Sequence, residues 1–206
     1  MPAPARSFRL DETAAVTRGR PTGIRALDKA LGGGIPPGVP VLIFGPSYSG
    51  KSTLAIQIAC RLPGPAYFCV PEMSPPILRT IADRSGADIA GVLVHDGPLS
   101  AWPEEATRAG ARVALVDSVN KFPDPRAALE QAVTWARGGE RWALCIAHET
   151  RRAKPLFRAE YEPDAVFRVT RGKDDRQTLD VWKARWSGFR GKIRLDFARV
   201  SANRVG

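Results

Sequence analysis

The chain has 206 residues, of which 44% are apolar and 25% are charged, with a formal net charge of +10; this composition is that of a globular domain and excludes fibrous and disordered proteins. The sequence has no apolar run near the roughly 18 residues that a membrane-spanning helix needs, and its first residues lack the apolar centre of a signal peptide. Cys60, Cys69 and Cys145 show no C-x-x-C spacing. We therefore expect a cytoplasmic protein without a structural zinc site or disulfide framework.

The positive charge is concentrated in the last third of the chain. Residues 1–140 carry a net charge of +2, whereas residues 141–206 carry +8. Such an asymmetry favours a polyanionic partner such as nucleic acid. A solvated basic face is the alternative interpretation.

The first elements prepare a phosphate-binding motif. Residues 1–20 are polar and weakly patterned, which predicts an arm or linker, and a single domain is expected over 21–206. Thr22 can cap a short helix that ends at the glycines 32–34, and residues 39–44 form a continuous apolar run typical of a buried strand.

The residues that follow this strand match G-x-x-x-x-G-K-S, and the next stretch, 52–62, is helix-like. Glycines allow successive backbone N–H groups to curl around a phosphate, and the positive end of the following helix faces the same anion. Lys51 can reach the terminal phosphates, and the Ser52 hydroxyl is the expected Mg²⁺ ligand. We predict that the nucleotide is bound by Gly45, Pro46, Ser47, Tyr48, Ser49, Gly50, Lys51, Ser52 and Thr53.

Strands and helices then alternate along the chain. Apolar runs predict strands at 66–70, 91–95, 113–116 and 142–147, and helix signals predict helices at 74–85, 103–109 and 124–136. The charged stretch 149–163 reads as a long exposed loop, and strands are expected at 165–170, 178–182 and 192–200. The predicted fold class is α/β, with a mostly parallel central sheet flanked by helices and mixed or antiparallel strands at the C-terminus.

Two carboxylates follow predicted strands, where ligands gather in open α/β sheets. Asp117 is placed to help hold Mg²⁺, and Glu72 to orient or deprotonate an attacking water. Asp117 could instead cap a turn, and Glu72 could be a surface acid. His148 ends another strand, where it either senses the terminal phosphate or is a hydrogen-bonded histidine at the rim.

Five segments resemble the motifs of RecA-superfamily ATPase cores, in the same order. Residues 21–57, PTGIRALDKALGGGIPPGVPVLIFGPSYSGKSTLAIQ, are similar to the opening of these cores, especially in the bacterial RadA (Sms) branch. VPEMS at 70–74 resembles the glutamate-bearing segment, and VALVDSV at 113–119 resembles Walker B. AHETR at 147–151 resembles the H-x-T-K segment, and KARW at 183–186 resembles K-N-R-F.

The resemblance implies a RecA-like P-loop ATPase that uses ATP and Mg²⁺ and forms rings or filaments with nucleotide between subunits. It further implies that Lys183 and Arg185 reach the phosphates of a neighbouring subunit, where cations stabilise the transferring phosphoryl group. The alternative is that both side chains only lie on the face of a strand.

The departures from the RadA (Sms) pattern are also informative. Proteins of that branch carry a four-cysteine zinc module and a Lon-protease-like domain, and this sequence shows neither. The loop 151–158, RRAKPLFR, lacks the glycines that the family has there. It still offers cations that could track phosphates and a ring that could stack on a base: Arg151, Arg152, Lys154, Arg158 and Phe157. A mobile solvated loop is the alternative.

The sequence thus predicts a Mg²⁺-dependent ATPase that oligomerises and binds single-stranded DNA in recombination, repair or replication. The alternative is a KaiC-like or adaptor module in which nucleotide controls protein contacts without DNA binding.

Overall fold

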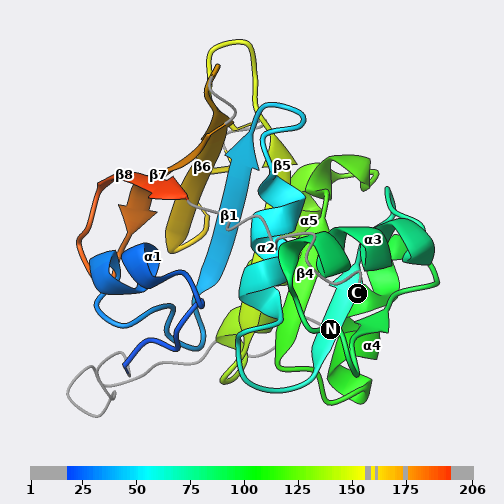
Figure 1. Ribbon diagram of the computed structural model, residues 1–206. Coiled ribbons are helices and arrows are strands. Elements are labelled where there is room, and N and C mark those ends of the chain that lie inside the picture. The colour runs from blue at the N-terminus through cyan, green and yellow to red at the C-terminus, as the bar shows by residue number, and fades with distance from the viewer. Residues whose placement is uncertain (1–17, 156–158, 161, 174–175, 196–206) are drawn as a thin grey trace, which may run out of the picture.

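A computed structural model describes residues 18–155, 159–160, 162–173 and 176–195 (Figure 1). Within these ranges, eight strands form one sheet in the order β3-β2-β4-β5-β1-β6-β7-β8. The strands are β1 (Pro40–Gly45), β2 (Ala66–Cys69), β3 (Leu93–Val94), β4 (Val113–Asp117), β5 (Trp142–His148), β6 (Ala165–Arg171), β7 (Gln177–Ala184) and β8 (Gly191–Leu195).

The sheet has a parallel part and an antiparallel part. The first six strands in the sheet order, β3-β2-β4-β5-β1-β6, pair in parallel. Strand β7 is antiparallel to both β6 and β8. The predicted sheet is therefore confirmed, with its antiparallel strands at the C-terminal side.

Helices cover both faces of the sheet, which explains why its central strands are apolar throughout. They are α1 (Arg25–Ala30), α2 (Lys51–Ala59), α3 (Pro75–Ser85), α4 (Trp102–Arg108) and α5 (Pro125–Arg137). Side chains of α1, α2 and α3 pack on one face together with Val41 and Ile43. Side chains of α4 and α5 pack on the other with Leu42 and Phe44, because successive residues of a strand point to opposite faces.

Local signals set the helix ends. Asp124 caps α5 by accepting hydrogen bonds from the N–H groups of Arg126 and Ala127, both at 3.0 Å. Gly86 ends α3 in the left-handed conformation, with φ of 67°. Thr22 does not cap α1; its hydroxyl donates to Asp28 Oδ1 at 2.7 Å and accepts from the Ile24 N–H at 3.2 Å.

The strand register defines two opposite edges of the sheet. At the carboxyl ends of the parallel strands, Gly45 pairs with His148 and Asp117 with Ile146. Strand β7 runs the other way, so its first residue, Gln177, lies at this same edge beside Arg171, and its last, Ala184, pairs with Ala165 at the far edge. No helix in the described ranges is long and apolar enough to cross a membrane.

Candidate active site

The loop between β1 and α2 is shaped by two glycines that other strands approach closely. Gly45 has φ of 149°, and a Cβ there would lie 2.1 Å from the Val169 carbonyl oxygen. Gly50 has φ of 96°, and a Cβ there would lie 2.1 Å from Nε2 of Gln177. At Gly45 the β6 backbone leaves no room for a side chain, whereas at Gly50 the close atoms belong to the Gln177 side chain and the left-handed φ is what favours glycine.

Lys51 lies at the start of α2, inside the loop. Its Nζ donates to the Pro46 carbonyl oxygen at 2.7 Å, and the residue is 7% exposed. Burial lowers the pKa of Lys51, while Asp117, Glu149 and Glu72 act in the opposite direction. The N-terminus of α2 has no side-chain cap, so its first N–H groups and Lys51 can together bind an anion.

Asp117, at the carboxyl end of β4, and Ser52, in the first turn of α2, bring a carboxylate and a hydroxyl together. Asp117 is 4% exposed. Burial raises the pKa of its carboxyl group, and a hydrogen bond with Ser52 acts against this. A carboxylate and a hydroxyl beside a phosphate loop suit Mg²⁺, which is bound by few protein oxygens together with nucleotide phosphates.

Glu72 lies among polar groups that orient its carboxylate. Ser118 Oγ donates to Glu72 Oε1 at 3.4 Å, Lys121 Nζ lies 3.6 Å from the same oxygen, and His148 Nε2 lies 3.9 Å from it. The backbone N–H of His148 donates to Asn120 Oδ1 at 2.8 Å. Glu72 and His148 are therefore held together by the segment directly after Asp117.

These groups line one cavity of about 610 Å³. The site residues predicted from the sequence that line this cavity are Ser47, Tyr48, Gly50, Lys51, Ser52, Thr53, Glu72, Asp117 and His148. Two buried polar atoms beside it, Ser49 Oγ and Gln177 Oε1, have no hydrogen-bond partner among the described residues. The Ser49 hydroxyl can donate to a phosphate oxygen, whereas Gln177 Oε1 can only accept, so Ser49 and Lys51 are the side-chain donors that suit a phosphorylated ligand.

Sequence reasoning missed the rest of the lining: Arg84, Ile146, Arg171 and Gln177. Arg171 ends β6 and Gln177 begins β7, so the antiparallel hairpin brings both to the loop. The available signal was their position at predicted strand ends. Arg84 lies in the last turn of α3 and had no comparable signal.

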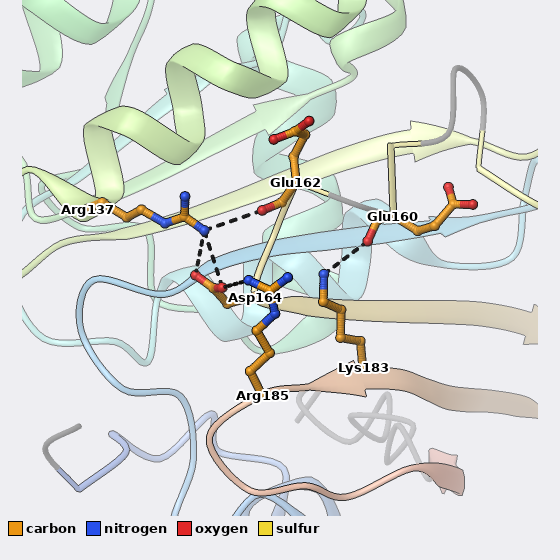
Figure 2. Close-up of polar contacts among 6 residues, drawn as sticks. All are labelled: Arg137, Glu160, Glu162, Asp164, Lys183 and Arg185. Atoms are coloured by element: carbon orange, nitrogen blue, oxygen red, sulfur yellow. Dashed lines mark hydrogen bonds and ion pairs between the residues drawn. The ribbon is translucent and has the colours of Figure 1, made fainter. Parts of the chain in front are cut away.

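Lys183 and Arg185 lie outside this cavity, at the opposite edge of the sheet, and Figure 2 shows them beside Glu160 and Asp164. Lys183 Nζ donates to the Glu160 carbonyl oxygen at 3.2 Å, and Arg185 Nη1 donates to Asp164 Oδ1 at 2.8 Å. This placement separates both cations from the phosphate loop of their own subunit.

The basic loop begins at the rim of the cavity, directly after His148. Arg151, Arg152 and Lys154 are exposed. The start of the loop is anchored by Glu149, whose Oε2 accepts a hydrogen bond from Arg168 Nε at 2.9 Å. Phe157 and Arg158 lie outside the described residues.

Comparisons with known proteins agree on one superfamily, although no family model matches the chain. The DNA repair protein RadA of a Synechocystis species is 34% identical over 125 residues, which cover 50% of this chain and 25% of that protein. RadB, a DNA repair and recombination protein of Pyrococcus abyssi, is 36% identical over 69 residues, 32% of this chain and 30% of its own. RecA of a Roseiflexus species is 40% identical over 120 residues, 53% and 33% respectively.

The crystal structure of a KaiC-like protein from Pyrococcus horikoshii shares the fold, with a TM-score of 0.72, 17% identity and coverage of 87% of this chain and 94% of that one. The chain has a RecA-like fold, and about half of it is similar in sequence to RecA and RadA proteins. It spans a quarter to a third of the length of the curated relatives above. In this RecA-like core, Lys51, Asp117 and Glu72 lie at the carboxyl ends of the parallel strands. Lys183 and Arg185 lie at the opposite edge of the sheet.

Asp117→Asn is expected to stabilise the RecA-like core in the absence of Mg²⁺ and nucleotide. The folded-state pKa of Asp117 is raised by burial, so ionisation at neutral pH opposes folding, and Asn removes that charge. The free energy of unfolding should rise by about 0.5–2 kcal/mol at pH 7.5. Because a raised carboxyl pKa costs stability only above the unfolded value, the gain should shrink as the pH falls toward about 3.9.

Urea unfolding across this pH range measures the effect. Asp83→Asn, at an exposed carboxylate of α3, is the matched control and should change little. A destabilised Asp117→Asn protein at pH 7.5 would contradict the assigned cost of burying this charge.

Proposed function

We propose that the protein is a Mg²⁺-dependent ATPase that assembles with further copies and binds single-stranded DNA in recombination, repair or replication. The observation that supports it best is the single cavity that joins Lys51, the Ser52 and Asp117 pair, and Glu72. These groups supply a phosphate cradle, oxygen ligands for Mg²⁺ and a carboxylate for water.

Each group has a part in the proposed reaction. The loop N–H groups and Lys51 bind the β- and γ-phosphates. Bound Mg²⁺, held by Ser52 and Asp117, would neutralise negative charge on these phosphates. Glu72 orients and deprotonates the attacking water, and its contacts with Ser118 and Lys121 fix the direction of its carboxylate.

The stabilisation of the transferring phosphoryl group is assigned to another subunit. Lys183 and Arg185 lie at the opposite edge of the sheet from their own phosphate loop, so in one subunit they cannot contact the same nucleotide. Stacking of copies edge to edge would bring these cations to the phosphates of a neighbour. Cations placed in this way lower the barrier to phosphoryl transfer.

Binding of DNA is assigned to the exposed cations that follow His148. Arg151, Arg152 and Lys154 can track a phosphate backbone. The segment follows His148, which lines the nucleotide cavity, so a strand bound there would lie next to that cavity. Relatives named for DNA repair and recombination support this assignment.

Glu72→Gln should separate nucleotide binding from hydrolysis. The amide keeps the size of the side chain but cannot accept a proton, so kcat should fall by about 10²-fold or more while the Kd for ATP changes by less than about threefold. Steady-state phosphate release and calorimetric binding of ATP measure the two quantities. Glu140→Gln, at a largely exposed carboxylate paired with Arg112, is the control. Normal hydrolysis by Glu72→Gln would remove Glu72 from the role of base.

Replacement of Arg151, Arg152 and Lys154 by Ala should weaken single-strand binding and its dependence on salt. Each phosphate contact contributes about 0.7 to the slope of log K against log salt, so the triple variant should lose about 2 from that slope. Fluorescence anisotropy with a labelled oligonucleotide and a non-hydrolysable ATP analogue, between 50 and 300 mM salt, measures it. Arg25, Lys29 and Arg108, all exposed, replaced together by Ala, form the control.

If the unaltered protein bound no single strand at any salt concentration, DNA binding would be wrong. The remaining interpretation would then be a regulatory module in which nucleotide controls protein contacts.

A further inference from the structure

Arg185 donates a hydrogen bond to the carboxylate of Asp164, a residue whose backbone is held by two further hydrogen bonds. Asp164 directly precedes β6, its N–H donates to the Pro40 carbonyl oxygen at 3.2 Å, and its own carbonyl oxygen accepts from the Arg185 N–H at 3.1 Å. Asp164 is therefore tied to β1 on one side and to the end of β7 on the other. Its carboxylate is a fixed point at this edge of the sheet.

Two guanidinium groups share this carboxylate (Figure 2). Arg137 Nη2 donates to Oδ1 and Oδ2 at 3.2 and 3.1 Å, and Arg185 Nη1 donates to Oδ1 at 2.8 Å. The Asp164 side chain is only 18% exposed, whereas that of Arg185 is 56% exposed. The carboxylate thus holds one side of the Arg185 guanidinium, and the group still faces solvent.

Asp164 also offsets the repulsion between the cations at this edge. Burial lowers the pKa of Lys183. The positive charges of Arg185 and Arg137 lower this pKa further, whereas the Asp164 carboxylate raises it. Beside these groups lies a cavity of about 390 Å³ whose lining includes Lys183, Arg185 and Arg190. Glu160, Val166 and Trp182 complete the lining, so three cations outnumber one carboxylate around this cavity.

We propose that Asp164 is a positioning residue that directs Arg185 toward the nucleotide phosphates of an adjacent copy of this chain. The inference rests on the proposed function, in which Arg185 acts between subunits. Asp164 itself contacts no reacting atom; it fixes the guanidinium in the direction that catalysis needs. Misplacement of such a group by about 1 Å can cost as much as 10²-fold in rate.

A structural role makes a different prediction. If Asp164 only fastens α5 to the sheet through Arg137, then removing either partner of that pair should have the same effect. Exposed ion pairs of this kind contribute about 0–1 kcal/mol to stability, and their loss leaves kcat unchanged.

The test compares Asp164→Asn with Arg137→Gln in DNA-stimulated ATP hydrolysis by the full chain. Asp164→Asn should lower kcat by about 10- to 100-fold with a KM for ATP within about threefold of the original, because the cation acts in the transition state. Arg137→Gln leaves the Arg185 contact intact and should keep kcat within about threefold. Asp164→Glu, which keeps the charge, should recover part of the loss. Thermal melts confirm that each variant is folded.

Mixing experiments identify the subunit in which Asp164 acts. Lys51→Ala copies lack a working phosphate loop but carry intact Asp164 and Arg185, so they should restore activity to Asp164→Asn copies. They should restore Arg185→Ala copies in the same way. An unchanged kcat in Asp164→Asn, an equal loss in Arg137→Gln, or no restoration by Lys51→Ala would overturn the positioning role.

Arg185→Ala separates failure of this inference from failure of the proposed function. If Arg185→Ala copies lose activity and Lys51→Ala copies restore it, action between subunits stands whatever Asp164→Asn does. If Arg185→Ala hydrolyses ATP normally, or is not restored by mixing, the proposed role of Arg185 is wrong, and the positioning role of Asp164 falls with it.

Discussion

The contact between the phosphate loop and the antiparallel strands β6 and β7 is the constraint on which the site depends. Gly45 lies against the Val169 backbone carbonyl, which leaves no room for a Cβ, and Gly50 lies against the Gln177 side-chain amide with a left-handed φ of 96°. The shape of the loop is therefore set from outside as well as by its own backbone. In the same two strands, Ala165 pairs with Ala184 and Val166 with Lys183. This register places Lys183 at the far edge of the sheet.

This arrangement places complementary groups of one proposed site at opposite edges of a rigid sheet. The phosphate loop, Asp117 and Glu72 lie at the carboxyl ends of the parallel strands, and Lys183 and Arg185 lie at the other edge. Regular backbone hydrogen bonding keeps these edges apart in a single subunit. Under the proposed function, a complete site requires two copies, and turnover then depends on assembly.

Buried charge makes the site costly for stability. Lys51 and Asp117 are both nearly inaccessible, and burial acts against the charged form of each. Lys51 donates to a backbone carbonyl, and Asp117 has a hydrogen bond with Ser52. Phosphate and a divalent cation, the ligands of the proposed function, would be stronger partners for these charges, so the site would trade stability for binding.

The sequence predicted what depends on local chemistry. The alternation of strands and helices follows from short-range patterns and is confirmed by the fold, whereas the cap expected at Thr22 is absent because that hydroxyl contacts Asp28 and Ile24. Lys51, Ser52, Glu72 and Asp117 could be assigned because each lies in a short motif at a strand end. The cavity that joins them depends on parallel strand order, which the motifs implied through their resemblance.

The parts that were missed depend on contacts between distant segments. Gln177 meets Gly50 across more than a hundred residues, and nothing in either segment indicates the other. Ser118 and Lys121 orient Glu72 only because β2 and β4 are neighbours in the sheet. Asp164 is an ordinary acid in a charged stretch until β1, α5 and β7 surround it.

The mass of the protein in solution tests the central claim, a site completed by a second copy, most directly. Sedimentation velocity would compare the protein alone, with Mg²⁺ and a non-hydrolysable ATP analogue, and with both plus single-stranded DNA. The account predicts that the nucleotide shifts the protein to oligomers and that DNA extends or stabilises them. A monomer under every condition would contradict it.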